Sequence, residues 1–210
     1  MTEPRPQVNL LKLSLNVSHL PNAIYNISQI PSNAKWSFKC ESVCTASFII
    51  RESGYIYQLF KKGHINVTKV RSFEDIEKAI DIIYYIIGVP QVIAKDYIID
   101  NIQATGRLKV YSKNKSLKYI CDALSRMQKN INITKLSFEA ERFPGAFIRY
   151  QDTKCRATVI LFNSRRFVII GVKTLNDVYK VHDWLQHCIS RAIEDLTCQE
   201  TCQQLALTKM

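Results

Sequence analysis

The sequence lacks several features that would place it in a large class of proteins. No apolar run reaches the eighteen or so residues of a membrane-spanning helix. Residues 1–6 lack the apolar core of a signal peptide. The seven cysteines include no CxxC pair, which argues against a zinc site and a disulfide framework. We therefore expect a soluble intracellular protein with reduced thiols and no membrane association.

Signatures of catalysis are also missing. The chain has no phosphate-binding loop, nucleophile elbow or deaminase signature. His19, His64 and His187 have no partner at a catalytic or metal-ligating spacing, and His182 falls on an apolar helical stripe, where a half-buried histidine is expected. We predict no catalytic residue, no metal and no cofactor, and hence a protein that is not an enzyme.

Acidic residues are few, which leaves a strongly basic chain. Lys and Arg number 29 against 18 Asp and Glu, for a formal net charge of +11. Most of the excess falls on residues 96–190, which carry 16 basic and 8 acidic groups. Such an excess attracts polyanions through counterion release. The composition alone leaves open a basic surface that serves only solubility.

The chain repeats itself at an offset of 102 residues. Segment 59–68 recurs as segment 161–170, and each copy runs directly into an [ST]-x-x-[DE] capping box at a helix start. These boxes are Ser72 with Asp75 and Thr174 with Asp177. The apolar positions that follow form one helical stripe in both copies. A strand, turn, strand and helix have therefore been duplicated, and neither copy is expected to close its own core.

Hydrophobic periodicity and turn signals give the element order of an antiparallel meander with long helices. We expect strands over 8–18, 44–51, 55–60, 65–70, 97–110, 147–150, 156–162 and 166–172, and helices over 21–30, 72–87, 116–127 and 174–191. The pattern predicts an α+β protein whose organisation is a first repeat over 1–94, a second repeat over 95–190 and a helical extension over 191–210.

One face of the predicted sheet has an unusual composition. An antiparallel sheet that is covered by helices on one side leaves its other side open. The open face combines amides, hydroxyls and aliphatic side chains, namely Asn66, Thr68, Asn101, Gln103 and Thr105 together with Leu10, Val168 and Ile170. This mixture is not that of an ordinary solvated surface, and it predicts a binding face.

A motif in the second half carries a family resemblance. Residues 137–145, SFEAERFPG, are similar to the S-Y-E-P-E-L-F-P-G signature of TATA-box-binding proteins, and Arg149, Arg156, Phe162 and the Gly-Val-Lys of 171–173 follow in the order of that family. Residues 99–102 resemble the I-Q-N-M that opens its second repeat. The resemblance implies a saddle in which two pseudo-symmetric repeats form one curved antiparallel sheet, with helices on the convex side.

The resemblance also implies which residues contact DNA. The concave sheet would lie on the A·T-rich minor groove, and two pairs of phenylalanines would pry open base steps. Phe143 and Phe162 form a complete second pair, whereas Phe60 stands beside Val43 in the first. Leu10 and Ile170 also depart from the family pattern. The implied DNA-binding residues are Val43, Phe60, Asn66, Thr68, Asn101, Gln103, Phe143, Phe162, Val168 and Ile170, with Arg51, Arg149, Arg156, Arg165 and Arg166 on phosphates.

The function implied by the resemblance is that of a general transcription initiation factor. It would bind and bend A·T-rich double-stranded promoter DNA and recruit RNA polymerase with other subunits of the transcription complex. Glu139 and Glu141 match the acidic loop with which the family contacts a TFIIB-type partner. The expected location is the nucleus, or a cytoplasmic viral factory if the chain is viral.

Two other functions stay open. The departures at Val43, Leu10 and Ile170, together with an acidic helix over 72–87, are compatible with a protein-interaction scaffold in a transcription complex that has little TATA-specific binding. The same fold also serves as an appended domain of DNA-repair or RNase H enzymes, but the sequence contains no catalytic domain. A phenylalanine in a strand is also a common core residue, so Phe60 and Phe162 could be core instead of wedge.

Overall fold

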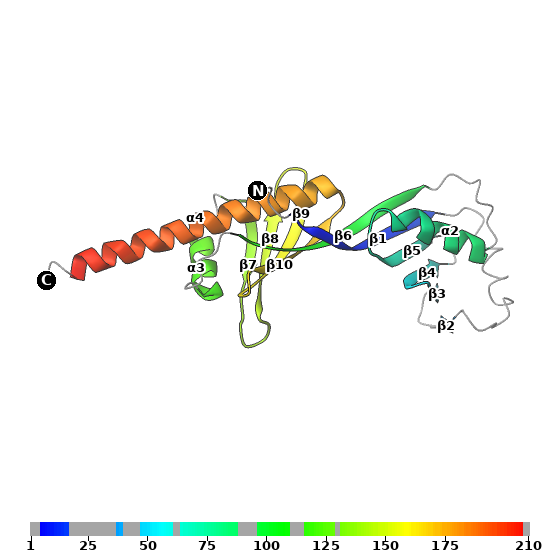
Figure 1. Ribbon diagram of the computed structural model, residues 1–210, viewed down its shortest axis with the longest axis horizontal. Helices are drawn as coiled ribbons and strands as arrows, with labels where there is room; N and C mark the ends of the chain where they lie inside the picture. The colour runs from blue at the N-terminus through cyan, green and yellow to red at the C-terminus, as the bar shows by residue number, and fades with distance from the viewer. Residues whose placement is uncertain are drawn as a thin grey trace. The chain divides into compact units, whose positions relative to one another are not determined.

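The computed structural model describes residues 5–16, 37–39, 47–60, 64–87, 96–109, 116–128 and 131–207. These residues form ten strands and three helices (Figure 1). The strands are β1 (Gln7–Asn16), β2 (Ser37–Lys39), β3 (Ser47–Glu52), β4 (Tyr55–Phe60), β5 (His64–Val70), β6 (Tyr97–Arg107), β7 (Ile133–Ser137), β8 (Gly145–Gln151), β9 (Arg156–Phe162) and β10 (Arg166–Val172). The helices are α2 (Asp75–Ile87), α3 (Leu117–Met127) and α4 (Leu175–Leu207).

The strands follow the order β2-β3-β4-β5-β1-β6-β10-β9-β8-β7. The chain divides into two compact units, Val8–Ile102, and Gln103–Met210 together with Met1–Gln7. We call them the first and the second unit. Strand β6 contributes residues to both units. The order confirms the predicted α+β class, in which two copies of a strand and helix arrangement share an antiparallel sheet.

In the first unit, helix α2 covers one face of the strands. The buried side chains of β1, β4 and β5 alternate along each strand, and they meet the apolar stripe of α2. The fully buried Tyr57 donates a hydrogen bond from its hydroxyl to the carbonyl of Ala79 on α2, at 3.0 Å. Ser72 accepts the backbone N–H of Asp75 at 3.3 Å, as a capping residue should.

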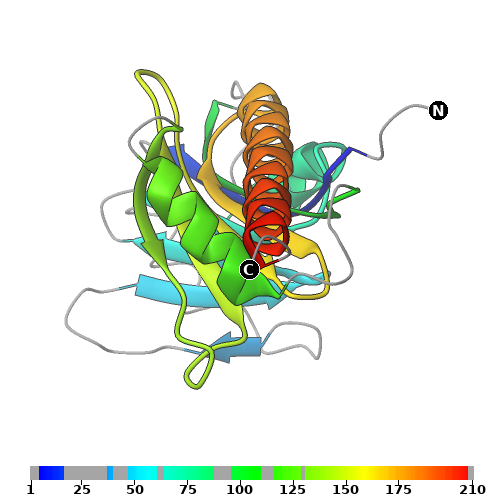
Figure 2. The ribbon, with the colours of Figure 1, turned by 90° about the vertical axis from the view of Figure 1, so that its left-hand side faces the viewer.

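In the second unit, α4 packs on β10 and on α3, and Figure 2 views α4 almost end-on with α3 beside it. Trp184 on α4 donates its indole N–H to the carbonyl of Ile131 at 2.7 Å, and its ring lies 4.7 Å from that of Tyr150. The predicted capping box is present, because Asp177 donates its backbone N–H to Thr174 at 3.1 Å. These contacts fix α4 against one face of the sheet and leave the other face open.

Two strands were not predicted, and for the last residues of one helix the sequence left open a continuation or a short separate helix. Strand β2 and the edge strand β7 are short, and β7 has only weak alternation in the pattern Ile-Thr-Lys-Leu-Ser. Helix α4 continues to Leu207, so the C-terminal residues extend the preceding helix. No glycine or proline interrupts 172–207, which is why the polar end of this segment stays helical. The predicted helix over 21–30 lies outside the described residues.

Candidate nucleic-acid interface

The open face of the second unit follows from strand register. On β9 the accessible side chains alternate with the buried Ala157, Val159 and Leu161. Val168 and Ile170 of β10 stand opposite Ile160 and Thr158, so all four side chains share one face. Gln103 on β6 is half-buried between the buried Ile102 and Ala104. The face thus carries the aliphatic and amide groups that the sequence predicted.

Three phenylalanines gather at one end of this face. The Phe143 ring centroid lies 5.9 Å from that of Phe162 and 5.1 Å from that of Phe147. Phe143 is 36% exposed and Phe147 is 38% exposed, so neither is a core residue. Sequence reasoning missed Phe147, although its place in the alternation of β8, between the buried Ala146 and Ile148, was a usable signal. Exposed aromatic groups at this density mark a binding surface.

Gly145 lies directly beneath two of these phenylalanine rings. It is the cross-strand partner of Phe162, and the rings of Phe143 and Phe162 cover it. A Cβ at this position would lie 2.7 Å from a ring carbon of Phe143, 2.9 Å from Ile160 and 3.0 Å from a ring carbon of Phe162. Because real Cβ atoms do not approach this closely, the two rings owe their arrangement to the missing side chain.

The predicted arginines lie around the same face. Arg149 on β8 stands opposite Thr158, and Arg156 begins β9; both are exposed. Arg166 begins β10 and is exposed. Arg165 occupies the β9–β10 turn with a φ of +69°, and its carbonyl accepts the backbone N–H of Leu108 at 2.9 Å. The turn is thereby held against the end of β6.

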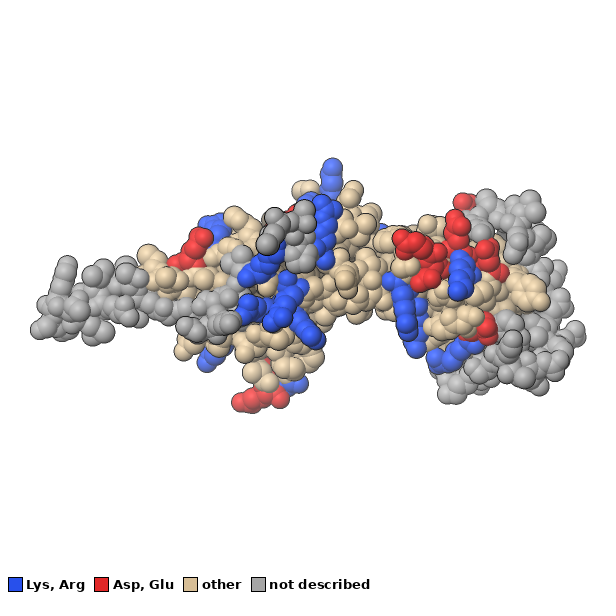
Figure 3. All heavy atoms as spheres, viewed as in Figure 1, with Lys and Arg blue, Asp and Glu red and all other residues tan. Residues whose placement is uncertain are grey.

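Two further arginines were missed by the sequence reasoning. A groove of about 760 Å³ starts at Phe162 and is lined by Arg5, Arg107 and Arg166, with no carboxylate among its lining residues. The guanidinium of Arg5 lies 4.6 Å from the ring centroid of Tyr179 on α4, a cation–π contact that positions the N-terminal arm. Figure 3 shows Lys and Arg atoms gathered over the second unit. This part of the chain is suited to binding a polyanion.

Comparisons with known proteins show which proteins are similar to this chain in sequence and in fold. No family model matches the chain. The chain is 27% identical over 177 residues to the TATA-box-binding protein of Methanococcus maripaludis, which covers 84% of each sequence. It is 28% identical over 123 residues to the TATA-box-binding protein of Picrophilus torridus, covering 57% of this chain and 60% of that protein. Over most of its length the chain is thus similar, at low identity, to TATA-box-binding proteins.

The solved TATA-box-binding protein of Methanococcus jannaschii has the same fold. It superposes with a TM-score of 0.66 at 20% identity, over 90% of this chain and 99% of that one. The agreement in fold extends across nearly all of both chains, although four in five aligned residues differ. The fold of the TATA-box-binding proteins is therefore retained here under extensive substitution of side chains.

The first unit differs most from what the family resemblance implies. Phe60 is half-buried, with its ring 5.7 Å from that of His64, and Val43 lies outside the described residues. Asn66 stands between Ser14 and Gln58 in the register of three strands. Thr68 donates to the carbonyl of Ile56 at 3.5 Å. Polar side chains dominate here, where the second unit has aliphatic and aromatic groups.

Four other predicted residues, on β3, β6 and β1, are placed as follows. Arg51 on β3 is exposed and stands opposite Ile56. Asn101 and Thr105 on β6 are half-buried. Leu10 on β1 is half-buried as well, next to the fully buried Leu11. The structure therefore places these side chains at the surface, where a ligand can reach them.

The two predicted partner-binding carboxylates lie in the loop between β7 and β8. Glu139 and Glu141 are exposed, and Glu139 forms an ion pair with Arg142 at 3.1 Å. The carbonyl of Glu139 accepts the backbone N–H groups of Arg142 and Phe143, both at 3.0 Å. These hydrogen bonds connect the acidic loop, for which the family resemblance implies partner binding, to the backbone of Phe143.

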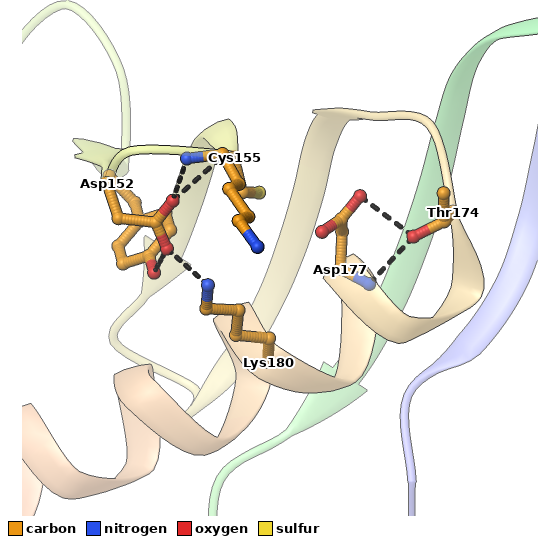
Figure 4. Close-up of polar contacts among 7 residues, drawn as sticks. Asp152, Cys155, Thr174, Asp177 and Lys180 are labelled. Carbon is orange, nitrogen blue, oxygen red and sulfur yellow. Dashed lines mark hydrogen bonds and ion pairs between the residues drawn. The ribbon is translucent and has the colours of Figure 1, made fainter.

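A polar network at the opposite ends of β8 and β9 has a structural role (Figure 4). Asp152 accepts the hydroxyl of Tyr150, the backbone N–H groups of Lys154 and Cys155, and an ion pair with Lys180 on α4. The Lys180 ammonium, followed by these other donors, lowers the pKa of the Asp152 carboxyl. Burial raises the pKa of the Cys155 thiol to about 11, so this cysteine stays protonated.

The described part of the chain contains neither a candidate membrane-spanning helix nor a candidate metal site. No helix there is long and apolar enough to cross a membrane. The described residues contain no group of three or more His, Cys, Asp or Glu side chains suited to hold a metal ion.

Proposed function

We propose that this protein is a general transcription initiation factor that binds A·T-rich promoter DNA through the minor groove and bends it. The observation that carries the proposal is the pair formed by the exposed Phe143 and the half-buried Phe162 over Gly145, at the end of an aliphatic open face. Apolar side chains that enter a base step unstack it and kink the duplex. The cost of unstacking is recovered when the bent duplex contacts more of the protein surface.

The rest of the open face supports a preference for A·T pairs. The minor groove presents acceptors at A·T pairs, whereas a G·C pair adds the guanine amino group. Val168, Ile170 and Ile160 offer aliphatic surface, which leaves that amino group without an acceptor. Asn66, Asn101 and Gln103 offer amide donors to the acceptors of A·T pairs.

The arginines supply the sequence-independent part of the affinity. Arg149 and Arg156 are exposed beside the open face, and Arg5, Arg107 and Arg166 line the groove that begins at Phe162. Each strand of a duplex carries one phosphate about every 3.4 Å of helix axis, so a backbone that passes Phe162 reaches this groove within a few nucleotides.

The decisive experiment compares duplexes and one wedge variant. Binding and bending of a short A·T-rich duplex are measured against a G·C-rich control by fluorescence anisotropy and energy transfer, for the wild type and for Phe143→Ala. Tyr119→Ala, which removes an exposed aromatic ring from α3, is the matched control. We expect preference for the A·T duplex, and a bend that is lost in Phe143→Ala and kept in Tyr119→Ala. Equal affinity for both duplexes with no bend would refute the proposal.

The acidic loop supports recruitment of a TFIIB-type partner, and through it of RNA polymerase. Glu139 and Glu141 are exposed beside the wedge, so a partner that contacts them would also lie close to the DNA. A Glu139→Arg/Glu141→Arg variant should bind the A·T duplex at least as well as the wild type but lose the ternary complex in a gel-shift assay. Glu194→Arg, on the exposed side of α4, is the matched charge reversal. A ternary complex that still forms with the double variant would refute this partner site.

A scaffold without TATA specificity is the second candidate function. Its support is the first unit, where Glu74, just before α2, and Glu77 on α2 are exposed and the open face is polar. In the duplex experiment this candidate predicts no A·T preference. The proposed location is the nucleus, or a cytoplasmic viral factory if the chain is viral.

A further inference from the structure

A histidine on the open face of the first unit lies between two asparagines. His64 begins β5 and stands opposite Asn16 at the end of β1. Its Nδ1 lies 3.2 Å from Oδ1 of Asn16, and its Nε2 lies 2.9 Å from Oδ1 of Asn66. Both ring nitrogens therefore face an amide oxygen.

This arrangement fits only one charge state of the histidine. A neutral imidazole has one N–H donor and one acceptor nitrogen, whereas the imidazolium donates from both nitrogens. Two amide oxygens against one ring are satisfied by the imidazolium. When the ring is neutral, one of the two amides must rotate to donate from Nδ2, and its oxygen then faces outward.

The charge of His64 thus decides what Asn16 and Asn66 offer to a ligand. With the imidazolium, both amides present N–H donors, and the acceptors of A·T pairs in the minor groove take donors. With the neutral ring, one amide presents an acceptor, which suits the guanine amino group. Histidine is the side chain that gains or loses its proton near physiological pH.

On the described strands around His64 few residues are charged, and Lys61 and Lys62 of the preceding turn lie outside the described residues. Strand β4 has no charged residue, and the charge on β5 is Lys69, at the far end of the strand. On β1 the charged residue is Lys12, four residues from Asn16, and it pairs with Asp100 of β6 at 3.8 Å.

We propose that His64 is a specificity-determining residue: by taking up a proton it turns the Asn16 and Asn66 amides into paired donors and strengthens recognition of A·T-rich minor grooves. The inference rests on the proposed function. It adds a residue on β5 that sequence reasoning did not assign to DNA, and it makes sequence discrimination depend on pH.

The first test follows the amides without DNA. In the full-length protein, NMR of the side-chain NH2 groups of Asn16 and Asn66 is recorded between about pH 5 and pH 8. We expect at least one amide to shift with the same midpoint as the His64 ring, and the shift to vanish in His64→Gln. Amide resonances that ignore the ring titration would overturn the inference, whether or not the protein binds DNA.

The second test measures recognition. Affinity for the A·T-rich and G·C-rich duplexes is determined at about pH 6 and pH 8 for the wild type, His64→Gln and His64→Ala, with His187→Ala on α4 as the control histidine. One or two hydrogen bonds correspond to about a threefold to tenfold change. We expect the A·T preference of the wild type and of His187→Ala to rise by that factor at the lower pH. His64→Gln should keep a preference that no longer depends on pH, because its amide donates at every pH, and His64→Ala should weaken it.

The two proposals fail in different ways. A wild type that prefers and bends A·T duplexes equally at both pH values leaves the proposed function intact and overturns the role of His64. A wild type that neither prefers nor bends A·T duplexes at any pH refutes the proposed function and, with it, this extension. A pH dependence that persists unchanged in His64→Gln also overturns the inference.

Discussion

Lys69 and Gly171 occupy the same backbone position in the two copies of the repeat. They are 102 residues apart, each is the residue before the last of its strand, and both are left-handed, with φ of +66° and +92°. In β5 the register shifts here, because Leu13 stands opposite Val67 while Leu11 stands opposite Val70. The duplication has thus preserved a left-handed position, which forms a β-bulge in β5, although only one copy has the glycine that suits it.

Substitutions at Gly171 and at Lys69 should change the free energy of unfolding in opposite directions. A left-handed non-glycine residue costs about 1–2 kcal/mol. Gly171→Ala should lower the free energy of unfolding by about 1 kcal/mol through strain alone, because its Cβ would have no heavy atom closer than 3.8 Å. Lys69→Gly should raise it by about 0.5–1 kcal/mol after the entropy of glycine is subtracted. Urea unfolding checks both; Lys69→Ala, which keeps the strain, is the control and should change little.

Gly145→Ala should separate wedge geometry from folding. The added methyl group displaces the Phe143 and Phe162 rings, which are exposed enough to move, so the free energy of unfolding should fall by only about 1 kcal/mol. The bend of an A·T duplex should fall nearly as far as in Phe143→Ala. A Gly145→Ala protein that bends DNA like the wild type would show that the paired rings do not form the wedge.

Replacing Arg5 and Arg107, the two arginines that the sequence did not mark as DNA-binding, should alter the salt dependence of binding. Each lost phosphate contact lowers the slope of log K against log salt concentration by about 0.9. Arg5→Ala/Arg107→Ala should therefore reduce the slope by about 1–2 and weaken A·T and G·C duplexes equally, without changing the bend. Arg191→Ala, on the exposed side of α4, should leave the slope unchanged. An unaltered slope in the double variant places the groove away from the bound duplex.

The Asp152 network should make stability fall in acid. The pKa of Asp152 is lower in the folded protein than in the unfolded chain, chiefly because of Lys180. Its contribution is therefore complete above the unfolded pKa of about 4 and is lost as the pH falls below that value. Lys180→Met should destabilise the protein at pH 7, and the difference from the wild type should shrink at pH 3. Chemical unfolding at both values measures it; a difference that stays constant with pH would exclude the ion pair as its source.

The parts of the fold that the sequence predicted are those with strong periodicity. The limits of β4, β9 and β10 agree residue for residue, because each strand is a short run rich in apolar and β-branched residues that is bounded by turn residues. Strand β7 was missed because an edge strand needs little apolar surface. The C-terminal half of α4 was left open because its sequence has no apolar stripe to mark a packed face.

The candidate site was predictable only where a motif or an alternation marked it. Phe143 and Phe162 were assigned through the motif, whereas Phe147 depends on its ring contact with Phe143, which register alone does not give. Arg5 and Arg107 are far apart in sequence, and they converge only when the N-terminal arm lies beside the end of β6. The contact of His64 with two asparagines likewise depends on the register of β1 against β5.

The open faces of the two units carry different side chains, which distinguishes the two orientations of a bound duplex. If both units carried the same side chains, a duplex could be bound in either of two orientations with equal energy. The second unit carries three phenylalanines and aliphatic groups, whereas the first carries a histidine, asparagines and serine. An asymmetric A·T-rich site would then be read in one sense, so that a single protein chain, without a second factor, could tell upstream from downstream.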